Sequence, residues 1–380
     1  MGFDLLSLKK VEESNVTTHY FRHVVVGEDL FSIALFHELQ KKYGEGQVTW
    51  VSPRPVNEKD LLPIGPSLLR GEHNIAAFKR FFPDVTVEEF EAPSEFFKEL
   101  KWRQFGGRAK SEKLLWNEEF YTQKRGEIDF EELFPFLKEE GLYERLEKAR
   151  FDFSVKNLLK MTPDDLAEPA NFQIELSNND LLKCENLYWG LGPGDLLSAF
   201  NDKKELSDEF ITYCEHAESP SALLVQLVFE KPITDKRETI FIPLSYTHEW
   251  GHFVGEFSSD KNGKQKAEFV TFMDMDHTNE DEISKKIRLL KKNLEKIFGD
   301  SAGLISDEFI KVTTQSPCLN FDDNLFVKVS DEVGQLKIAS YNGPLEHLTQ
   351  EQGSFEDSWS SVNNLARAAV RHQEVLNSLS

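Results

Sequence analysis

The alternation of apolar and polar positions near the start of the chain predicts a strand, a helix and a second strand. Residues 23–26 form an apolar run, residues 30–43 carry apolar side chains with the spacing of one helix face, and residues 47–52 form a second apolar run. Two apolar strands joined by a helix build a right-handed βαβ unit. We therefore expect a parallel sheet in this part of the chain.

Further along, segments with helical spacing alternate with strand-like segments. The strand-like segments 222–231, 238–246 and 266–275 follow one another without helices, which indicates an antiparallel sheet. The segment 277–299 is the clearest helix, because Thr278 or Asn279 can cap it and acidic residues fill its first turn. The other expected elements are helices within 60–82, 130–152, 154–161 and 358–379, and a strand pair within 172–191.

Composition limits the class of protein. The chain has 380 residues, which suits two domains or one large domain with an insertion. Its formal net charge of −22 repels phosphate backbones and anionic lipid, so we expect neither nucleic acid nor a membrane as a partner. No apolar run approaches the roughly 18–20 residues that span a bilayer.

Cysteine usage and the first residues indicate the cellular compartment. Cys184, Cys214 and Cys318 are odd in number and far apart, which favours reduced thiols over disulfides or a zinc ribbon. The first residues do not show the basic and apolar segments of a secretory signal. The sequence thus predicts a cytoplasmic protein.

The loop after the first expected strand has the position of a dinucleotide-binding loop but not its composition. Such a loop needs glycines for a tight turn, for the approach of N–H groups to a diphosphate, and for close helix packing. Gly27 fills the first place and is followed by Glu28. The second and third places are filled by Asp29 and Ser32. Two like charges about 4 Å apart repel by roughly 4 kcal/mol at an effective dielectric of about 20, so Asp29 opposes a diphosphate. The second strand ends at Ser52, where a carboxylate would hold ribose hydroxyls.

Four segments, in a fixed order along the chain, carry a family resemblance. The loop 27–32 comes first. The segment 61–71 is similar to a Gly/Pro segment after the βαβ unit, 185–200 to a strand with a Pro-containing loop, and 336–370 to a final strand, loop and helix. In this order the chain resembles the flavin-dependent amine oxidase and phytoene desaturase superfamily.

The resemblance implies an α/β fold. It consists of a Rossmann-type FAD/NAD(P)-binding domain and a second α+β domain with an antiparallel sheet and helices. The dinucleotide-binding-like domain would be discontinuous, at 18–90, 168–205 and 318–380, and the substrate-like domain would comprise 91–167 and 206–317.

Positions that contact the flavin in the family are altered in three segments: the loop, the end of the second strand and the last strand. That strand ends in Ala339-Ser340-Tyr341 without the family's Asp. The start of the last helix reads Gly353-Ser354-Phe355-Glu356-Asp357, and Asp357 replaces the small residue that the family has there. The cofactor-binding residues that the resemblance implies, as remnants of a site, are Gly27, Glu28, Asp29, Ser32, Ser52, Gly353 and Ser354.

Three altered segments in one expected pocket favour a chain that keeps the fold and has lost its cofactor. We expect a non-catalytic member of the superfamily, a pseudoenzyme without FAD or catalytic residues, that binds or scaffolds a protein partner or an unidentified small ligand. Glu28 and Asp29 should then cap the helix, and Tyr341 and Phe355 should cover the strand ends. The alternative is a divergent but active FAD-dependent oxidoreductase in which N–H groups of residues 28–31 hold the diphosphate.

A third hypothesis comes from a match to the His-Glu-x-x-His motif of zinc hydrolases. On a helix, His248 and His252 would share one face and bind zinc, with Glu249 as general base. The flanking segments are strand-like, and Gly251 disfavours a helix. In a strand the two histidines would stand about 13 Å apart, too far to share an ion. We therefore expect a hairpin without a metal.

Overall fold

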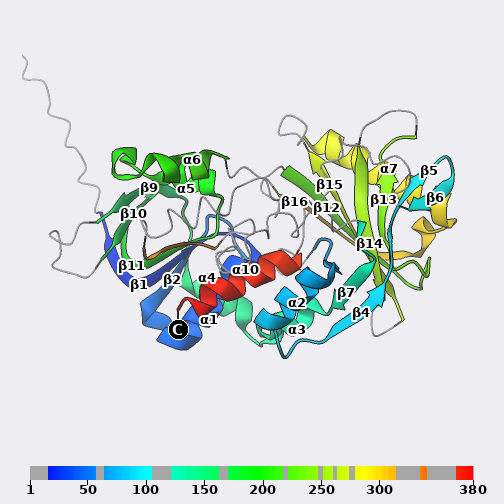
Figure 1. Ribbon diagram of the computed structural model, residues 1–380. Coiled ribbons are helices and arrows are strands. Elements are labelled where there is room, and N and C mark those ends of the chain that lie inside the picture. Colours follow the sequence, from blue (N-terminus) through cyan, green and yellow to red (C-terminus); the bar gives the residue numbers. More distant parts are fainter. Residues whose placement is uncertain are drawn as a thin grey trace, which may run out of the picture.

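The computed structural model describes residues 16–56, 64–104, 121–161, 170–216, 221–246, 251–259, 263–273, 279–313, 334–339 and 365–379. Figure 1 shows two lobes, and each is built on a seven-stranded sheet. A third sheet has three strands. No helix in the described ranges combines the length and the apolar character that a membrane crossing requires.

The first sheet is mainly parallel. Its strands, in spatial order, are β8 (Arg150–Phe151), β2 (Val48–Val51), β1 (Thr18–Val26), β11 (Leu181–Trp189), β10 (Phe172–Leu176) and β9 (Val155–Lys160), and β17 (Leu336–Ile338) also pairs with β11. Strands β8, β2, β1, β11 and β17 pair in parallel, whereas β10 runs in the opposite direction and pairs antiparallel with both β11 and β9. One edge of β11 is shared, because its first residues pair with β10 and its last residues pair with β17.

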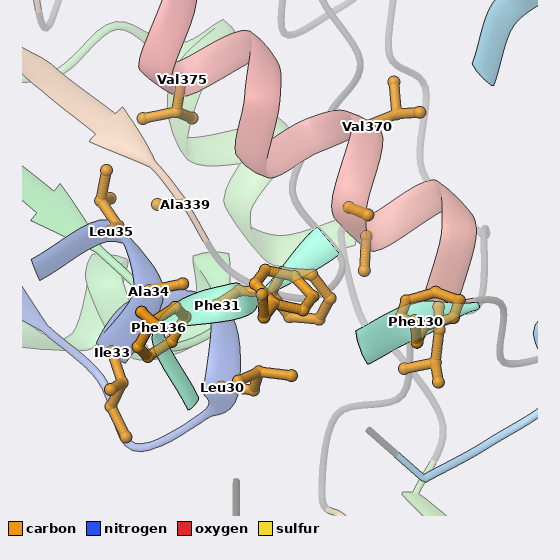
Figure 2. Packing of buried hydrophobic residues seen from close by; sticks show 14 of the residues in the cluster. Leu30, Phe31, Ile33, Ala34, Leu35, Phe130, Phe136, Ala339, Val370 and Val375 are labelled. Carbon is orange, nitrogen blue, oxygen red and sulfur yellow. The ribbon is translucent and has the colours of Figure 1, made fainter. Parts of the chain in front are cut away.

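Helices cover both faces of this sheet. Val25 of β1 belongs to the core cluster with α1 (Leu30–Tyr43) and α10 (Leu365–Asn377). Its neighbours Val24 and Val26 belong to the cluster with α5 (Pro193–Ala199) and α6 (Asp208–His216). Burial on both faces explains why the strand is continuously apolar. Figure 2 shows side chains of α1 and α10 entering the same cluster; those labelled are Leu30, Phe31, Ile33, Ala34, Leu35, Val370 and Val375.

The second sheet is almost entirely antiparallel. Its strands, in spatial order, are β16 (Ile305–Thr313), β12 (Ser221–Phe229), β15 (Gln265–Met273), β14 (His252–Ser259), β13 (Thr239–Pro243), β5 (Ser94–Lys98) and β6 (Lys101–Gln104). Only the pair β13–β5 is parallel. Helix α7 (Glu280–Phe298) covers one face with Leu290 and Leu294, and Asn279 caps it by accepting a hydrogen bond from the Glu282 N–H.

A third sheet, three further α-helices and short 3₁₀ helices are the remaining elements of the described ranges. The third sheet is antiparallel, with the order β3 (Leu69–Arg70), β7 (Lys124–Ile128) and β4 (Val87–Glu91). The other α-helices are α2 (Glu72–Phe81), α3 (Phe130–Leu133) and α4 (Leu142–Ala149). Short 3₁₀ helices are η1 (Glu45–Gln47), η4 (Pro135–Lys138), η6 (Lys203–Glu205) and η8 (Ala302–Leu304).

The fold class expected from the sequence is confirmed, and two local expectations are wrong. The segment 154–161 is strand β9 and not a helix, because it pairs with the exposed edge of β10. The first strand begins at Thr18, five residues before the apolar run, because its polar residues pair with the equally long β11.

Sheet membership also differs from the expected boundary at residue 168. Strands β8 and β9 lie in the range 91–167, which the sequence assigned to the second domain. They pair with β2 and β10 and so extend the first sheet. The division into two domains itself stays a prediction.

Candidate functional site

The candidate site lies at the carboxyl ends of the parallel strands. Gly27 follows β1, Ser52 follows β2 and Gly190 follows β11, so the three residues meet at one edge of the first sheet. Open α/β sheets bind their ligands at this edge. The fold therefore brings together five of the expected site residues, Gly27, Glu28, Asp29, Ser32 and Ser52, whereas Gly353 and Ser354 lie outside the described residues.

The helix α1 begins in close contact with two strands. A Cβ atom added to Gly27 would stand 2.2 Å from Ser32 Oγ, and one added to Gly190 would stand 2.0 Å from the same atom. Gly190 also donates its N–H to the Val26 carbonyl at 2.5 Å. The two glycines are thus required by the close approach of α1 and β11. Sequence analysis did not single out Gly190, although a glycine directly after an apolar strand was the available signal.

Asp29 occupies the N-terminus of α1. Its Oδ1 accepts a hydrogen bond of 2.7 Å from the Ser32 N–H, and its carbonyl accepts one of 3.1 Å from the Ile33 N–H. Burial raises the pKa of this carboxyl group, and the hydrogen bonds to Ser32 oppose the shift. The expectation that Asp29 caps the helix is confirmed. The N–H group that would face a diphosphate is therefore already bonded to a carboxylate.

Glu28 and Ser52 take part in a turn beside the loop. Glu28 does not cap α1; its Oε2 lies 3.2 Å from Nε of Arg54. The buried Ser52 hydroxyl donates to the Arg54 carbonyl at 3.1 Å and accepts from the Arg54 N–H at 3.3 Å. Arg150 donates to the Ser52 carbonyl at 3.0 Å. Ser52 therefore stabilises the turn and offers no carboxylate to a ribose diol.

A pocket of about 250 Å³ opens at the same strand ends. Trp189 lies at its apolar side, fully buried and fixed by an Nε1 hydrogen bond of 3.1 Å to the Gly192 carbonyl. Sites for drug-sized ligands and cofactors span about 300–1,000 Å³. The residues in the pocket lining are Val26, Gly27, Glu28, Val51, Pro53, Phe153, Ser154, Val155, Lys156, Trp189, Leu191, Asp195, Ser198 and Ala199. The pocket is small for a whole dinucleotide, and we call it the strand-end pocket.

The described residues do not fit the diphosphate and ribose of FAD. The helix N-terminus carries a carboxylate, and the position after β2 is a hydroxyl that is already bonded. Tyr341 and Phe355, which the sequence analysis expects over the strand ends, lie outside the described residues.

Only the end of the His-Glu-x-x-His motif lies in the described residues, and there it forms part of the expected hairpin. His252 is the exposed first residue of strand β14 and pairs with Pro243 of β13. His248 and Glu249 lie outside the described residues. Within the part of the chain that the structure describes, no group of three or more His, Cys, Asp or Glu side chains could hold a metal ion.

Comparisons with known proteins identify the fold. No protein-family model and no curated protein matches the sequence. A wild-type putrescine oxidase bound to putrescine superposes with a TM-score of 0.51 at 10% identity, covering 95% of this chain and 99% of that one. Cyclohexylamine oxidase from Brevibacterium oxydans IH-35A superposes with a TM-score of 0.53 at 9% identity, covering 94% and 98%. The chain therefore has the α/β fold of the flavin-dependent amine oxidases, as the sequence resemblance implies.

Proposed function

We propose that this protein is a non-catalytic binding protein on the fold of the FAD-dependent amine oxidases. The observation that carries the proposal is the Asp29 carboxylate, which takes the Ser32 N–H at the start of α1. That position is where such folds hold a diphosphate. The loop thus satisfies one N–H of its own helix N-terminus without an anionic ligand.

Energies of the competing interactions support this proposal. A diphosphate in this loop would displace an N-cap that contributes about 1 kcal/mol. It would also lie near a like charge, at a cost of roughly 4 kcal/mol at about 4 Å. A helix N-terminus returns only about 0.3–1 kcal/mol to an anion. The balance opposes a dinucleotide by several kcal/mol unless Asp29 leaves the site.

The competing function is a divergent FAD-dependent oxidoreductase. The fold of putrescine oxidase and cyclohexylamine oxidase favours it, and so does the strand-end pocket. It requires Asp29 to turn away so that backbone N–H groups of residues 28–31 hold the diphosphate. Zinc hydrolysis is the third hypothesis. Its motif requires a helix, whereas His252 lies in a strand.

Location and partners belong to the same proposal. Cys184 and Cys214 are buried thiols, which fits a reducing compartment such as the cytoplasm. The net charge of −22 fits a protein partner or a small ligand better than nucleic acid or an anionic membrane.

The proposal is tested by the melting temperature in the presence of ligand. A ligand at about 100 times its dissociation constant stabilises a protein by about 2.7 kcal/mol. We expect millimolar FAD to leave the melting temperature of the wild type unchanged. In the variant Asp29→Gly, which frees the Ser32 N–H, we expect inorganic pyrophosphate to raise it. Stabilisation of the wild type by FAD would contradict the proposal.

A further inference from the structure

The hairpin between β5 and β6 breaks the local rules for a two-residue turn. Glu99 and Leu100 form its tip with φ values of 54° and 61°. Turns of this type favour Asn and Gly, because other residues are strained at positive φ. Leu100 is also 75% exposed, the most exposed large apolar residue in the described ranges. Strained backbone positions and residues that break local rules cluster at functional sites.

Two like charges at the tip also destabilise the hairpin within a single molecule. Lys98 and Lys101 are directly opposite each other in the β5–β6 register, and like charges at such positions destabilise a hairpin. Arg103 forms an ion pair with Glu99. The tip thus carries three cations and one carboxylate in a chain whose net charge is −22.

The base of the hairpin is firmly held. Phe97 and Trp102 pack edge to face with centroids 5.1 Å apart, and Lys236 lies over the Trp102 ring at 4.5 Å. Phe97 is buried. Leu100 is therefore presented on a fixed support, which lowers the entropy cost of binding.

The strand-end pocket has the complementary chemistry. The pocket is open, its lining is mainly apolar, and its volume is about 250 Å³. An apolar cavity of about 150 Å³ already binds benzene, so this volume is large enough for a leucine side chain. Glu28 and Asp195 lie in its lining with Lys156. Glu28 is paired with Arg54, and Lys156 with Glu175. The lining itself holds two carboxylates, Glu28 and Asp195, and one ammonium group, Lys156.

We propose that Leu100 of one copy inserts into the strand-end pocket of a second copy, with Lys98 and Lys101 facing Glu28 and Asp195. Figure 1 places the β5–β6 hairpin at the outer end of one lobe and α5 in the other lobe, so the contact joins different molecules. The proposal rests on the proposed function, because a bound dinucleotide would occupy the pocket. The contact is head-to-tail, so it builds rings or open chains and not a two-fold dimer.

A second copy fits the tip better than an anionic membrane does. A second copy and an anionic membrane are both negatively charged overall, and salt screens charges beyond about 8 Å at either surface, so net charge does not separate the two partners. One leucine side chain is a small lipid anchor but fills a pocket of this size.

Sedimentation velocity over a concentration series tests the proposal. We expect the wild type to form species larger than a dimer as concentration rises. Leu100→Asp removes the insert, and Ser198→Trp fills the pocket from an exposed position on α5. Each variant alone should be monomeric, whereas an equimolar mixture should form a one-to-one dimer and nothing larger, because it contains one intact tip and one intact pocket. The control Val16→Asp changes another exposed apolar residue and should associate like the wild type.

Charge reversal gives the second measurement. Lys98→Glu with Lys101→Glu should raise the dissociation constant by at least about tenfold at low salt. A wild type that stays monomeric, a Leu100→Asp variant that associates normally, or a mixture without dimers would overturn the proposal. Binding to phosphatidylserine vesicles that Leu100→Asp abolishes would assign the tip to lipid and overturn it as well. A monomer without flavin contradicts this inference alone, whereas flavin in the purified protein contradicts the proposed function.

Discussion

Asp29 is held at the start of α1 by one backbone hydrogen bond, while burial opposes its charge. Because its folded pKa is raised, the ionised carboxylate is less stable in the folded than in the unfolded chain, and stability falls as pH rises through this range. Asparagine caps a helix about as well without a charge. Substitutions of Asp29 can therefore distinguish the effect of the helix cap from the effect of the charge.

We expect Asp29→Asn to keep or raise the free energy of unfolding at neutral pH. Asp29→Ala should lower it by about 1 kcal/mol, because the cap is lost. Urea unfolding of both variants checks this. Equal losses in the two variants would show that the charge, and not the cap, holds the loop.

Gly190 tests the close packing of loop and strand. In Gly190→Ala the new Cβ would stand 2.8 Å from the Val26 carbonyl oxygen, a backbone atom that cannot turn aside. Overpacking of this kind costs about 1–3 kcal/mol. Gly46→Ala is the matched control, since a Cβ there meets nothing within 4 Å. Thermal unfolding that shows equal effects at both positions would contradict the packing described here.

Sequence reasoning reached some of these residues and not others. The cap at Asp29 was predictable because an acid directly before an apolar helix has a local physical role. The need for glycine at 190 was not, because it depends on Ser32, which is 158 residues away in the sequence and adjacent only through the parallel pairing of β1 and β11.

The segment 64–70 is anchored to the second sheet by two buried carboxylates, of which Glu268 accepts the Gly65 N–H at 3.5 Å and Glu256 makes the closer contacts. Glu256 of β14 accepts hydrogen bonds from the N–H groups of Ser67 at 2.9 Å and Leu68 at 3.0 Å, and it is ion-paired with Arg70. Leu365 of α10 donates its N–H to the Pro66 carbonyl on the other side. The segment therefore links α10 and the second sheet.

We expect Glu256→Gln to lower the free energy of unfolding by about 3–5 kcal/mol, because it removes one partner of a buried ion pair. The exposed Glu89→Gln, which removes a surface pairing with Lys79 and Lys124, should leave the urea midpoint close to that of the wild type. If both variants behave alike, the carboxylate does not anchor the segment.

Elements with strong local periodicity were predictable, and elements that depend on a distant edge were not. Helix α7 followed from its cap and apolar face, and the β10–β11 hairpin from its turn. Strand β9 was predicted as a helix because its apolar spacing suits either structure, and only pairing with β10 decides.

Two histidines that lie near α1 are buried and neutral in the folded molecule. Burial lowers the pKa of His372 to about 4, and burial and the charge of Arg22 do the same for His23. A histidine with a depressed folded pKa stabilises the protein above its unfolded pKa of about 6.5, and this stability is lost as pH falls toward 4. For His372 the loss amounts to roughly 3 kcal/mol.

We therefore expect the melting temperature to fall steeply between pH 6.5 and about 4. In His372→Phe, which suits neighbours Phe31 and Phe134, the fall should be smaller. Burial raises the pKa of Asp29 and Glu268, and their protonation acts in the opposite direction, so the comparison with the variant is the measurement. An unchanged pH dependence in the variant would contradict a buried neutral His372.

We propose that this molecule keeps the amine oxidase fold while its own side chains take the place of the cofactor's diphosphate. The most direct test is the visible absorption spectrum of the full-length protein, purified without added flavin and then dialysed against FAD. We expect no flavin band before or after dialysis, because Asp29 caps α1 and Ser52 is bonded within its turn. A stoichiometric flavin band that survives gel filtration would contradict the claim and establish the divergent oxidoreductase.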